Sequence, residues 1–169
     1  MTNFKELSPL FQEVVEMHKG ILYKVARTYC RNEEDRQDLI QEMLVQIWKS
    51  LPKYNSQFAI TTWMYRISLN VAISFYRKNV ASQGREIFFD EQTLAFQEVD
   101  NAEKEQQLQL LEQFISELNS LDKALIILYL EEKSHAEISD ILGISISNIS
   151  TKVGRIKEKL KIRFTQLNS

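Results

Sequence analysis

Residues 134–163 read SHAEISDILGISISNISTKVGRIKEKLKIR, and this stretch predicts two short helices joined by a tight turn. Ile138, Ile141 and Leu142 fall on one face of the first helix. The apolar residues of the second helix recur every three or four positions, at Ile149, Val153, Ile156 and Leu160. Two amphipathic helices of this length, only a few residues apart, are typical of a helix-turn-helix.

Polar and glycine residues mark the ends of both helices. Ser134, with Glu137 three residues later, is a capping box that starts the first helix. Gly143 stands where this helix must stop, because glycine enters the left-handed conformation without steric cost. Ser145 can then cap the second helix.

The second helix predicts DNA binding, because donors, amides and cations line its exposed face. These residues are Ser147, Asn148, Ser150, Thr151, Lys152, Arg155, Lys157 and Lys159. Between Lys152 and Arg163 there are six basic residues and one acid. Small polar side chains at the start of such a helix reach base edges, and the cations behind them neutralise phosphates. An ordinary solvated helix face is the simpler alternative.

Composition favours a folded protein without covalent chemistry of its own. The 169 residues suit one ordinary domain or two small ones. The single Cys30 argues against disulfides and suits a reducing cytoplasm. No apolar run could cross a membrane, and no signal-peptide pattern opens the chain. His18 and His135 stand alone, so we expect no catalytic residues, no metal site and no cofactor.

The net charge of −2 is low for a DNA-binding protein, but the charges are segregated. Residues 80–119 hold nine acids against two bases, whereas residues 61–79 hold three bases and no acid. This segregation predicts separate surfaces for separate partners.

The N-terminal part predicts two helices. Helix 8–30 has an apolar stripe at Leu10, Val14, Met17, Ile21 and Val25. The next helix starts after a cap at Asn32 and ends at Pro52, with Leu39, Met43, Ile47 and Leu51 buried. Its other face presents Asp38, Gln41, Glu42 and Gln46, which suit a basic protein partner or simply solvent.

A third helix, 58–78, combines aromatic residues with cations. Its expected buried stripe is Trp63, Ile67, Val71 and Ser74. Tyr65, Phe75 and Tyr76 alternate with Arg66, Asn70, Arg77 and Lys78. Aromatic rings beside cations can capture unpaired bases, although each ring can equally serve as core.

The whole pattern predicts an all-α fold of two small helical domains joined by an acidic linker. Residues 1–79 form the first domain, residues 80–103 the linker, and residues 104–169 the second domain, which ends in the helix-turn-helix. Fully extended, the linker spans roughly 80 Å. Two helices, 108–118 and 121–129, precede the helix-turn-helix.

Three stretches together resemble the extracytoplasmic-function group of bacterial sigma factors. They are DRQDLIQEMLVQIWKSLPKY (35–54), FAITTWMYRISLNVAISFYRKN (58–79) and LDKALIILYLEEKSHAEISDILGISISNISTKVGRIKEKL (121–160). The resemblance covers about residues 33–79 and 103–163, and it has two independent motifs in the right order. It implies that the chain consists of regions 2 and 4 of a sigma factor. Such a factor directs RNA polymerase to promoters and helps to melt them.

The resemblance also implies partners and site residues. Polymerase clamp helices of the largest subunit would bind Asp38, Gln41 and Glu42. The minus-ten element would be read by Asn55, Ser56, Gln57, Trp63, Arg66, Asn70, Arg77 and Lys78. The minus-thirty-five element would be read by Ser145, Ser147, Asn148, Ser150, Thr151, Lys152 and Arg155. The flap of the second largest polymerase subunit and an anti-sigma factor are further expected partners.

The chain departs from the family pattern at two positions. Many members carry a basic residue where this chain has Ser150, and often another in place of Gly154.

Two alternatives for the function stay open on the residues alone. One is a stand-alone helix-turn-helix regulator, which would bind DNA tightly without polymerase. The other is a helical adaptor that binds only proteins, which would show no salt-dependent affinity for DNA.

Overall fold

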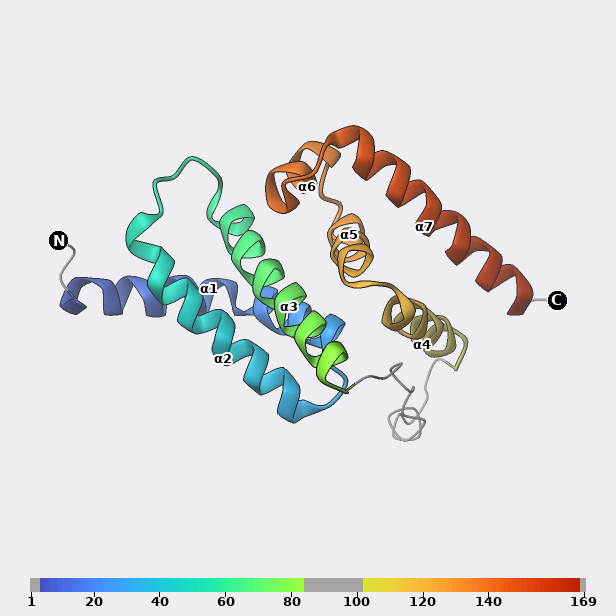
Figure 1. Cartoon of the computed structure of the whole chain (residues 1–169), viewed down its shortest axis with the longest axis horizontal. Coiled ribbons are helices and arrows are strands. Elements are labelled where there is room, and N and C mark those ends of the chain that lie inside the picture. The colour runs from blue at the N-terminus through green and yellow to red at the C-terminus, as the bar shows by residue number, and fades with distance from the viewer. Residues whose placement is uncertain (1–3, 84–101, 168–169) are drawn as a thin grey trace.

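The structure is a computed structural model that describes residues 4–83 and 102–167 (Figure 1). The first half of this described part holds α1 (Phe4–Tyr29), α2 (Glu33–Ser50), the short 3-10 helix η1 (Leu51–Lys53) and α3 (Ile60–Gln83). The second half holds α4 (Ala102–Glu117), α5 (Ser120–Leu130), α6 (His135–Leu142) and α7 (Ile146–Leu167). Each element described is a helix, which confirms the all-α prediction.

Several helix boundaries differ from the sequence prediction. Helix α1 starts at Phe4, before the predicted start at residue 8, and α4 starts at Ala102, before the predicted start at residue 108. Helix α3 continues to Gln83, beyond the predicted end at residue 78. Most of the predicted linker, residues 84–101, lies outside the described residues.

The buried face of α1 is not one continuous stripe, because the helix is kinked at His18 (φ −124°, ψ 15°). Met17, predicted to be buried, is 71% exposed, and Leu10 is 47% exposed. Beyond the kink, Leu22, Val25, Ala26 and Tyr29 enter the core. A strict three-or-four repeat assumes a straight helix, so the prediction was wrong for Leu10 and Met17, whereas Val14 does pack against the core.

Helices α1, α2 and α3 pack together around apolar side chains, and the α2 stripe is as predicted. Leu39, Met43, Ile47 and Leu51 are all buried. The Asn32 side chain caps α2 by accepting a bond from the Asp35 backbone N–H at 2.7 Å. In α3, by contrast, the buried residues are Thr62, Met64, Tyr65, Ser68, Leu69 and Ala72. The predicted stripe of Trp63, Ile67 and Val71 is only half-buried, and Ser74 is exposed.

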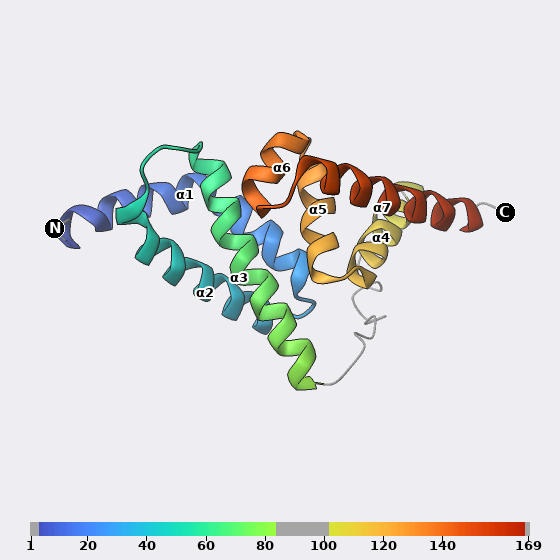
Figure 2. The same ribbon diagram turned by 45° about the horizontal axis from the view of Figure 1, so that its top comes forward.

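The two halves share one core, in which α5 is the central element. Figures 1 and 2 both show α5 and α6 beside α3, with α7 on the outer side. Buried residues of α5 run from Lys123 to Leu128 and join one apolar cluster with residues of α1, α2 and α3. The fully buried apolar side chains of α5 are each worth roughly 1.5–3 kcal/mol.

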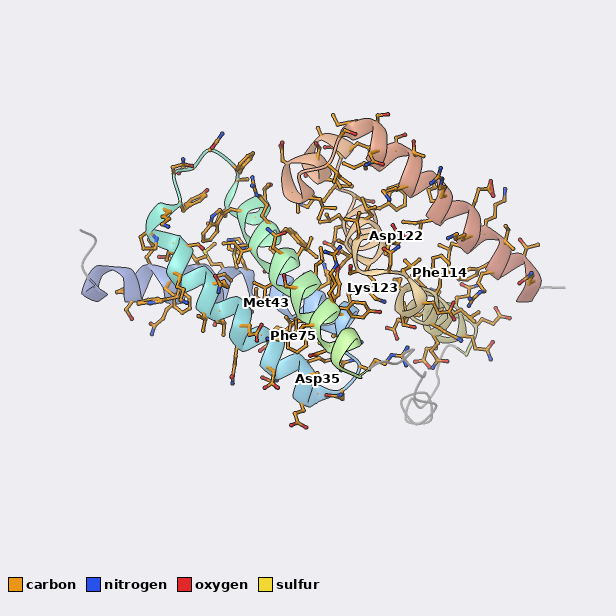
Figure 3. The ribbon with its side chains drawn as sticks, viewed as in Figure 1. Asp35, Met43, Phe75, Phe114, Asp122 and Lys123 are labelled. Atoms are coloured by element: carbon orange, nitrogen blue, oxygen red, sulfur yellow. The ribbon has the colours of Figure 1, made fainter. Side chains whose placement is uncertain are left out.

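Lys123 is the one charged side chain in this core that is almost fully buried among the described residues, at 1% exposure. It lies on α5 where that helix faces α3 (Figure 3). Its Nζ donates a hydrogen bond to the Ile115 carbonyl at 2.6 Å and lies 5.4 Å from the centre of the Tyr76 ring. Burial, and then the nearby Arg31 charge, lower the pKa of Lys123 to about 8.

The lowered pKa predicts how the free energy of unfolding depends on pH. Between about 8 and the ordinary value of 10.5, the native state binds fewer protons than the unfolded state, so stability rises with pH. Relative to Lys123→Met, the wild type should gain about 1 kcal/mol between pH 7 and pH 9. Denaturant unfolding at both pH values measures this difference. Lys49→Met, at an exposed position, is the control, and its free energy of unfolding should differ from that of wild type by the same amount at both pH values. If the difference between Lys123→Met and wild type is also the same at both pH values, the lowered pKa of Lys123 is contradicted.

Candidate functional site

An open groove of about 780 Å³ runs between α2 and α3. One wall consists of acidic and amide side chains of α2, and the opposite wall of α3 is mainly apolar. The lining residues are Asp38, Gln41, Glu42, Val45, Gln46, Ser50, Ile67, Asn70, Val71, Ser74 and Phe75. The predicted acidic face and the half-buried α3 stripe therefore meet in one surface. Its form suits an elongated partner with both basic and apolar side chains.

The apolar part of this groove went unrecognised in the sequence. Val45 is 49% exposed on α2, opposite Ile67, Val71 and Phe75 of α3. Spacing placed Ile67 and Val71 in the core, because periodicity marks an apolar face and not what covers it. The signal for this groove in the sequence was Val45, an apolar residue on the same helix face as the acidic and amide residues. Single exposed apolar residues are common, so this signal is weak.

A second pocket, of about 360 Å³, opens where α2 ends and α3 begins. It is lined by Ser50, Lys53, Tyr54, Asn55, Gln57, Phe58, Trp63, Arg66, Ile67 and Asn70. Five residues predicted to read the minus-ten element come together here: Asn55, Gln57, Trp63, Arg66 and Asn70. Lys53, Tyr54 and Phe58 are additional lining residues that the sequence analysis did not assign.

The loop between η1 and α3 shapes this pocket through its own hydrogen bonds. The Tyr54 hydroxyl donates to the Phe58 carbonyl at 2.8 Å, and the Gln57 N–H donates to Asn55 Oδ1 at 3.1 Å. Ser56, at the loop tip, adopts a positive φ of 63°. These bonds fix the conformation of a polar loop whose sequence shows neither helical nor strand periodicity.

Three aromatic rings, those of Tyr54, Phe58 and Trp63, line the pocket. The Tyr54 and Trp63 rings lie 5.1 Å apart at 48°, and the Arg66 guanidinium carbon lies 4.9 Å from the centre of the Phe58 ring. Rings and a cation beside exposed amides are the combination that stacks on an unpaired base and holds its backbone.

The other three residues of the predicted minus-ten set lie outside this pocket. Ser56 is exposed at the loop tip, and Lys78 is exposed near the end of α3. Arg77 donates from Nε to the Ser120 hydroxyl oxygen at 3.1 Å and so contacts the second half.

The helix-turn-helix has the caps that the sequence predicted. Ser134 Oγ accepts a bond from the Glu137 N–H, and Ser145 Oγ accepts one from the Asn148 N–H, both at 3.1 Å. Gly143 adopts φ 71°, and its N–H donates to the Ser139 carbonyl at 2.8 Å. A side chain at position 143 would be strained in this conformation. The turn therefore fixes α7 relative to α6.

Helix α7 presents its polar face outward, opposite a buried face formed by Ile149, Val153 and Ile156. Of the residues predicted to read the minus-thirty-five element, six are exposed and Lys152 is half-buried: Ser145, Ser147, Asn148, Ser150, Thr151, Lys152 and Arg155. Ile146, which is 51% exposed at the first position of α7, was not among the predicted site residues. Gly154 lies on the exposed side, and an added Cβ there would meet no atom within 4 Å.

Within residues 4–83 and 102–167, no cluster of three or more His, Cys, Asp or Glu side chains could hold a metal ion. None of the helices described is both long and apolar enough to cross a membrane. Cys30 is buried, and burial raises the pKa of its thiol to about 12.

The chain matches known proteins over both halves. Residues 14–81 match the family described as Sigma-70 region 2, and residues 108–160 match Sigma-70, region 4. The chain is 30% identical over 137 residues to RNA polymerase sigma factor YlaC of Bacillus subtilis, covering 79% of each chain. It is 21% identical over 175 residues to the ECF RNA polymerase sigma factor SigW of the same organism, covering 93% of this chain and 90% of that protein.

The fold is also similar to a solved structure. The sigma factor RpoE of Bartonella quintana, crystallised with the anti-sigma factor NepR, superposes with a TM-score of 0.69 at 20% identity. The superposition covers 92% of this chain and 96% of that one. With both family matches in chain order and relatives aligned over most of their length, this chain belongs to the extracytoplasmic-function group of RNA polymerase sigma factors, which are transcription initiation factors.

Proposed function

We propose that the two halves of this sigma factor divide the work of promoter recognition. Residues 1–79 would act as the region 2 domain, residues 80–103 as an acidic linker, and residues 104–169 as the region 4 domain. The family matches at 14–81 and 108–160 support this division. The single observation that carries the proposal is the separation of an acidic, partly apolar groove on α2 and α3 from a basic polar face on α7.

The groove between α2 and α3 is the proposed polymerase site. Asp38, Gln41 and Glu42 form its polar wall, and Val45 and the facing apolar residues of α3 form its apolar part. Clamp helices of the largest polymerase subunit would place basic side chains against the carboxylates and apolar side chains against this apolar part. Desolvation of the apolar residues would supply affinity, and the charges would set the orientation of the partner.

The loop pocket beside the groove is the proposed minus-ten site. One unpaired base would stack against Trp63 and Tyr54. Arg66 would contact the DNA backbone, and Asn55 and Asn70 would hydrogen-bond to base edges. Stacking is worth roughly 1–3 kcal/mol per base, which offsets part of the cost of melting the duplex. Ser56, Gln57, Arg77 and Lys78 would contact the backbone around it.

Helix α7 is the proposed minus-thirty-five reader. Its N-terminal Ser145, Ser147 and Asn148 would reach base edges in the major groove, and Ser150 and Thr151 would follow them along the helix. Lys152 and Arg155 would neutralise phosphates. The second polymerase contact, on the flap, is proposed for this same half.

This function involves binding and not bond-making, so we propose that the protein is not an enzyme. As a polymerase subunit it would work in the cytoplasm. The complex of one structural relative with an anti-sigma factor supports the proposal that such an inhibitor also controls this chain.

The polymerase site is tested by Gln41→Ala combined with Glu42→Lys. Both side chains are exposed on α2, so the fold should remain intact while affinity for core polymerase falls at least tenfold, because a repelling charge replaces an attracting one. Gln12→Ala with Glu13→Lys, an equally exposed Gln–Glu pair on α1, is the matched control. Fluorescence titration with core polymerase measures affinity. Unchanged affinity in the α2 variant would refute the assigned groove.

The upstream site is tested by Lys152→Ala combined with Arg155→Ala. If each side chain neutralises one phosphate, the slope of log affinity against log salt should become shallower by about 1.8. Titration of holoenzyme onto a promoter fragment at several salt concentrations gives this slope. Affinity for core polymerase should be unaffected; losing that affinity instead would mean that the two surfaces are assigned the wrong way round.

Gly154 offers a gain-of-function test, because the site has room for a side chain and many family members carry a cation there. Gly154→Arg should steepen the same salt slope by about 0.9 by adding one phosphate contact. Gly154→Ala is the matched control, since it raises helix stability by about 1 kcal/mol without adding charge. Equal slopes for the two variants would place position 154 away from the DNA backbone.

A further inference from the structure

A large apolar side chain lies exposed among the polar residues at the start of α7. Ile146, the first residue of this helix, is 51% exposed, whereas Ile149, three residues later, is fully buried. Ser145 and Ser147 on either side of Ile146, and Ser150 one turn further along, are exposed polar residues. Residues four apart on a helix are surface neighbours, so Ile146 lies next to Ser150, at the end of α7 that is proposed to enter the major groove.

The turn before α7 holds Ile146 in a defined position. The Ser145 Oγ accepts a bond from the Asn148 N–H at 3.1 Å, and the Ser145 carbonyl accepts one from the Ile149 N–H at 3.0 Å. A β-branched side chain on a helix has one strongly preferred χ1 rotamer. Backbone and side chain are therefore both constrained before any partner binds. Ile146 can offer its apolar surface with little further loss of conformational entropy.

Hydrogen bonds within α7 occupy part of the polar chemistry at this end of the helix. The Thr151 hydroxyl donates to the Ser147 carbonyl at 3.1 Å, so its one proton is already used. Ser145 Oγ already accepts from the Asn148 N–H. The first cation along α7 is Lys152, and it is half-buried. Fewer polar groups are thus left to distinguish bases, and an apolar contact would add discrimination that they do not supply.

Thymine is the base that presents an apolar group in the major groove. Each base pair shows its own pattern of donors and acceptors there, and thymine adds the methyl group on C5. The first residues of a recognition helix are the ones that reach base edges. We propose that Ile146 is a specificity-determining residue, which contacts the 5-methyl group of one thymine in the minus-thirty-five element. This inference rests on the proposed function of α7.

Deoxyuridine tests this contact, because it pairs as thymidine does and lacks only the methyl group. A promoter fragment that the holoenzyme transcribes would carry deoxyuridine in place of one upstream thymidine at a time, on either strand. Titration of holoenzyme onto each fragment measures its affinity. For wild type, one of these replacements should weaken binding about fourfold, which is the effect of losing one buried methyl group.

The variant Ile146→Ala shows whether that methyl group and this side chain contact each other. It should bind the unmodified fragment at least fourfold more weakly than wild type does, and the sensitive deoxyuridine should cause no further loss. Ile162→Ala is the matched control, because Ile162 is 56% exposed near the other end of α7, and this variant should respond to deoxyuridine like wild type. Ile146→Ala should also keep the wild-type slope of log affinity against log salt, since it removes no phosphate contact.

The outcomes separate the methyl contact from the function on which it rests. If the holoenzyme selects no promoter fragment over random DNA, the proposed function of α7 fails. The function stands and the methyl contact is wrong if the selected element contains no thymine, or if no deoxyuridine weakens wild-type binding. The contact is equally wrong if Ile146→Ala responds to the sensitive deoxyuridine as strongly as wild type does. The scan with wild type needs no variant, so it can refute the contact by itself.

Discussion

The burial of α5 where the two halves meet is the interaction on which the rest of the structure depends. This helix contacts α1 and α3 on one side and α4 and α7 on the other. Its central residues, Lys123 to Leu128, are all buried. An eleven-residue helix could not hold this conformation alone, so its stability comes from the packing that surrounds it. Helix α7 in turn packs on α5 and α6, and so the position of its exposed polar face follows from this core.

Charge segregation explains how a protein of net charge −2 can bind DNA. Carboxylates and amides of α2 face the groove with α3, whereas the cations of α7 lie on a separate outward surface. An acidic surface near DNA would repel phosphate, and a basic one would repel a basic protein partner. Because the acidic and the basic surfaces are separate, one small chain can bind both a basic protein partner and DNA.

Sequence patterns predicted those parts of the molecule that depend on local chemistry. The helix-turn-helix was predicted residue by residue, because Ser134, Gly143 and Ser145 determine its caps and the apolar repeat of α7 determines its buried face. Helix α2 was predicted for the same reasons. What failed depended on long-range packing. Leu10 and Met17, before the kink at His18 in α1, are exposed. Ile67 and Val71 of α3, expected to be buried, are half-buried and line a groove.

The pocket at the start of α3 was predicted only in part. The family resemblance supplied Asn55, Gln57, Trp63, Arg66 and Asn70, but Tyr54 and Phe58 join them through loop hydrogen bonds that no periodicity records. The packing of α5 against α1 and α3 was likewise invisible in the sequence. Tyr29, Arg77 and Ser120 are far apart in the chain, and nothing in their local patterns marks them as partners.

Run-off transcription with purified core polymerase and genomic promoter fragments tests the central claim most directly. The account predicts discrete transcripts that require both core polymerase and this protein, with little binding of the protein to the same fragments in the absence of polymerase. Tight binding of the protein alone to those fragments, together with no transcripts after core polymerase is added, would contradict it.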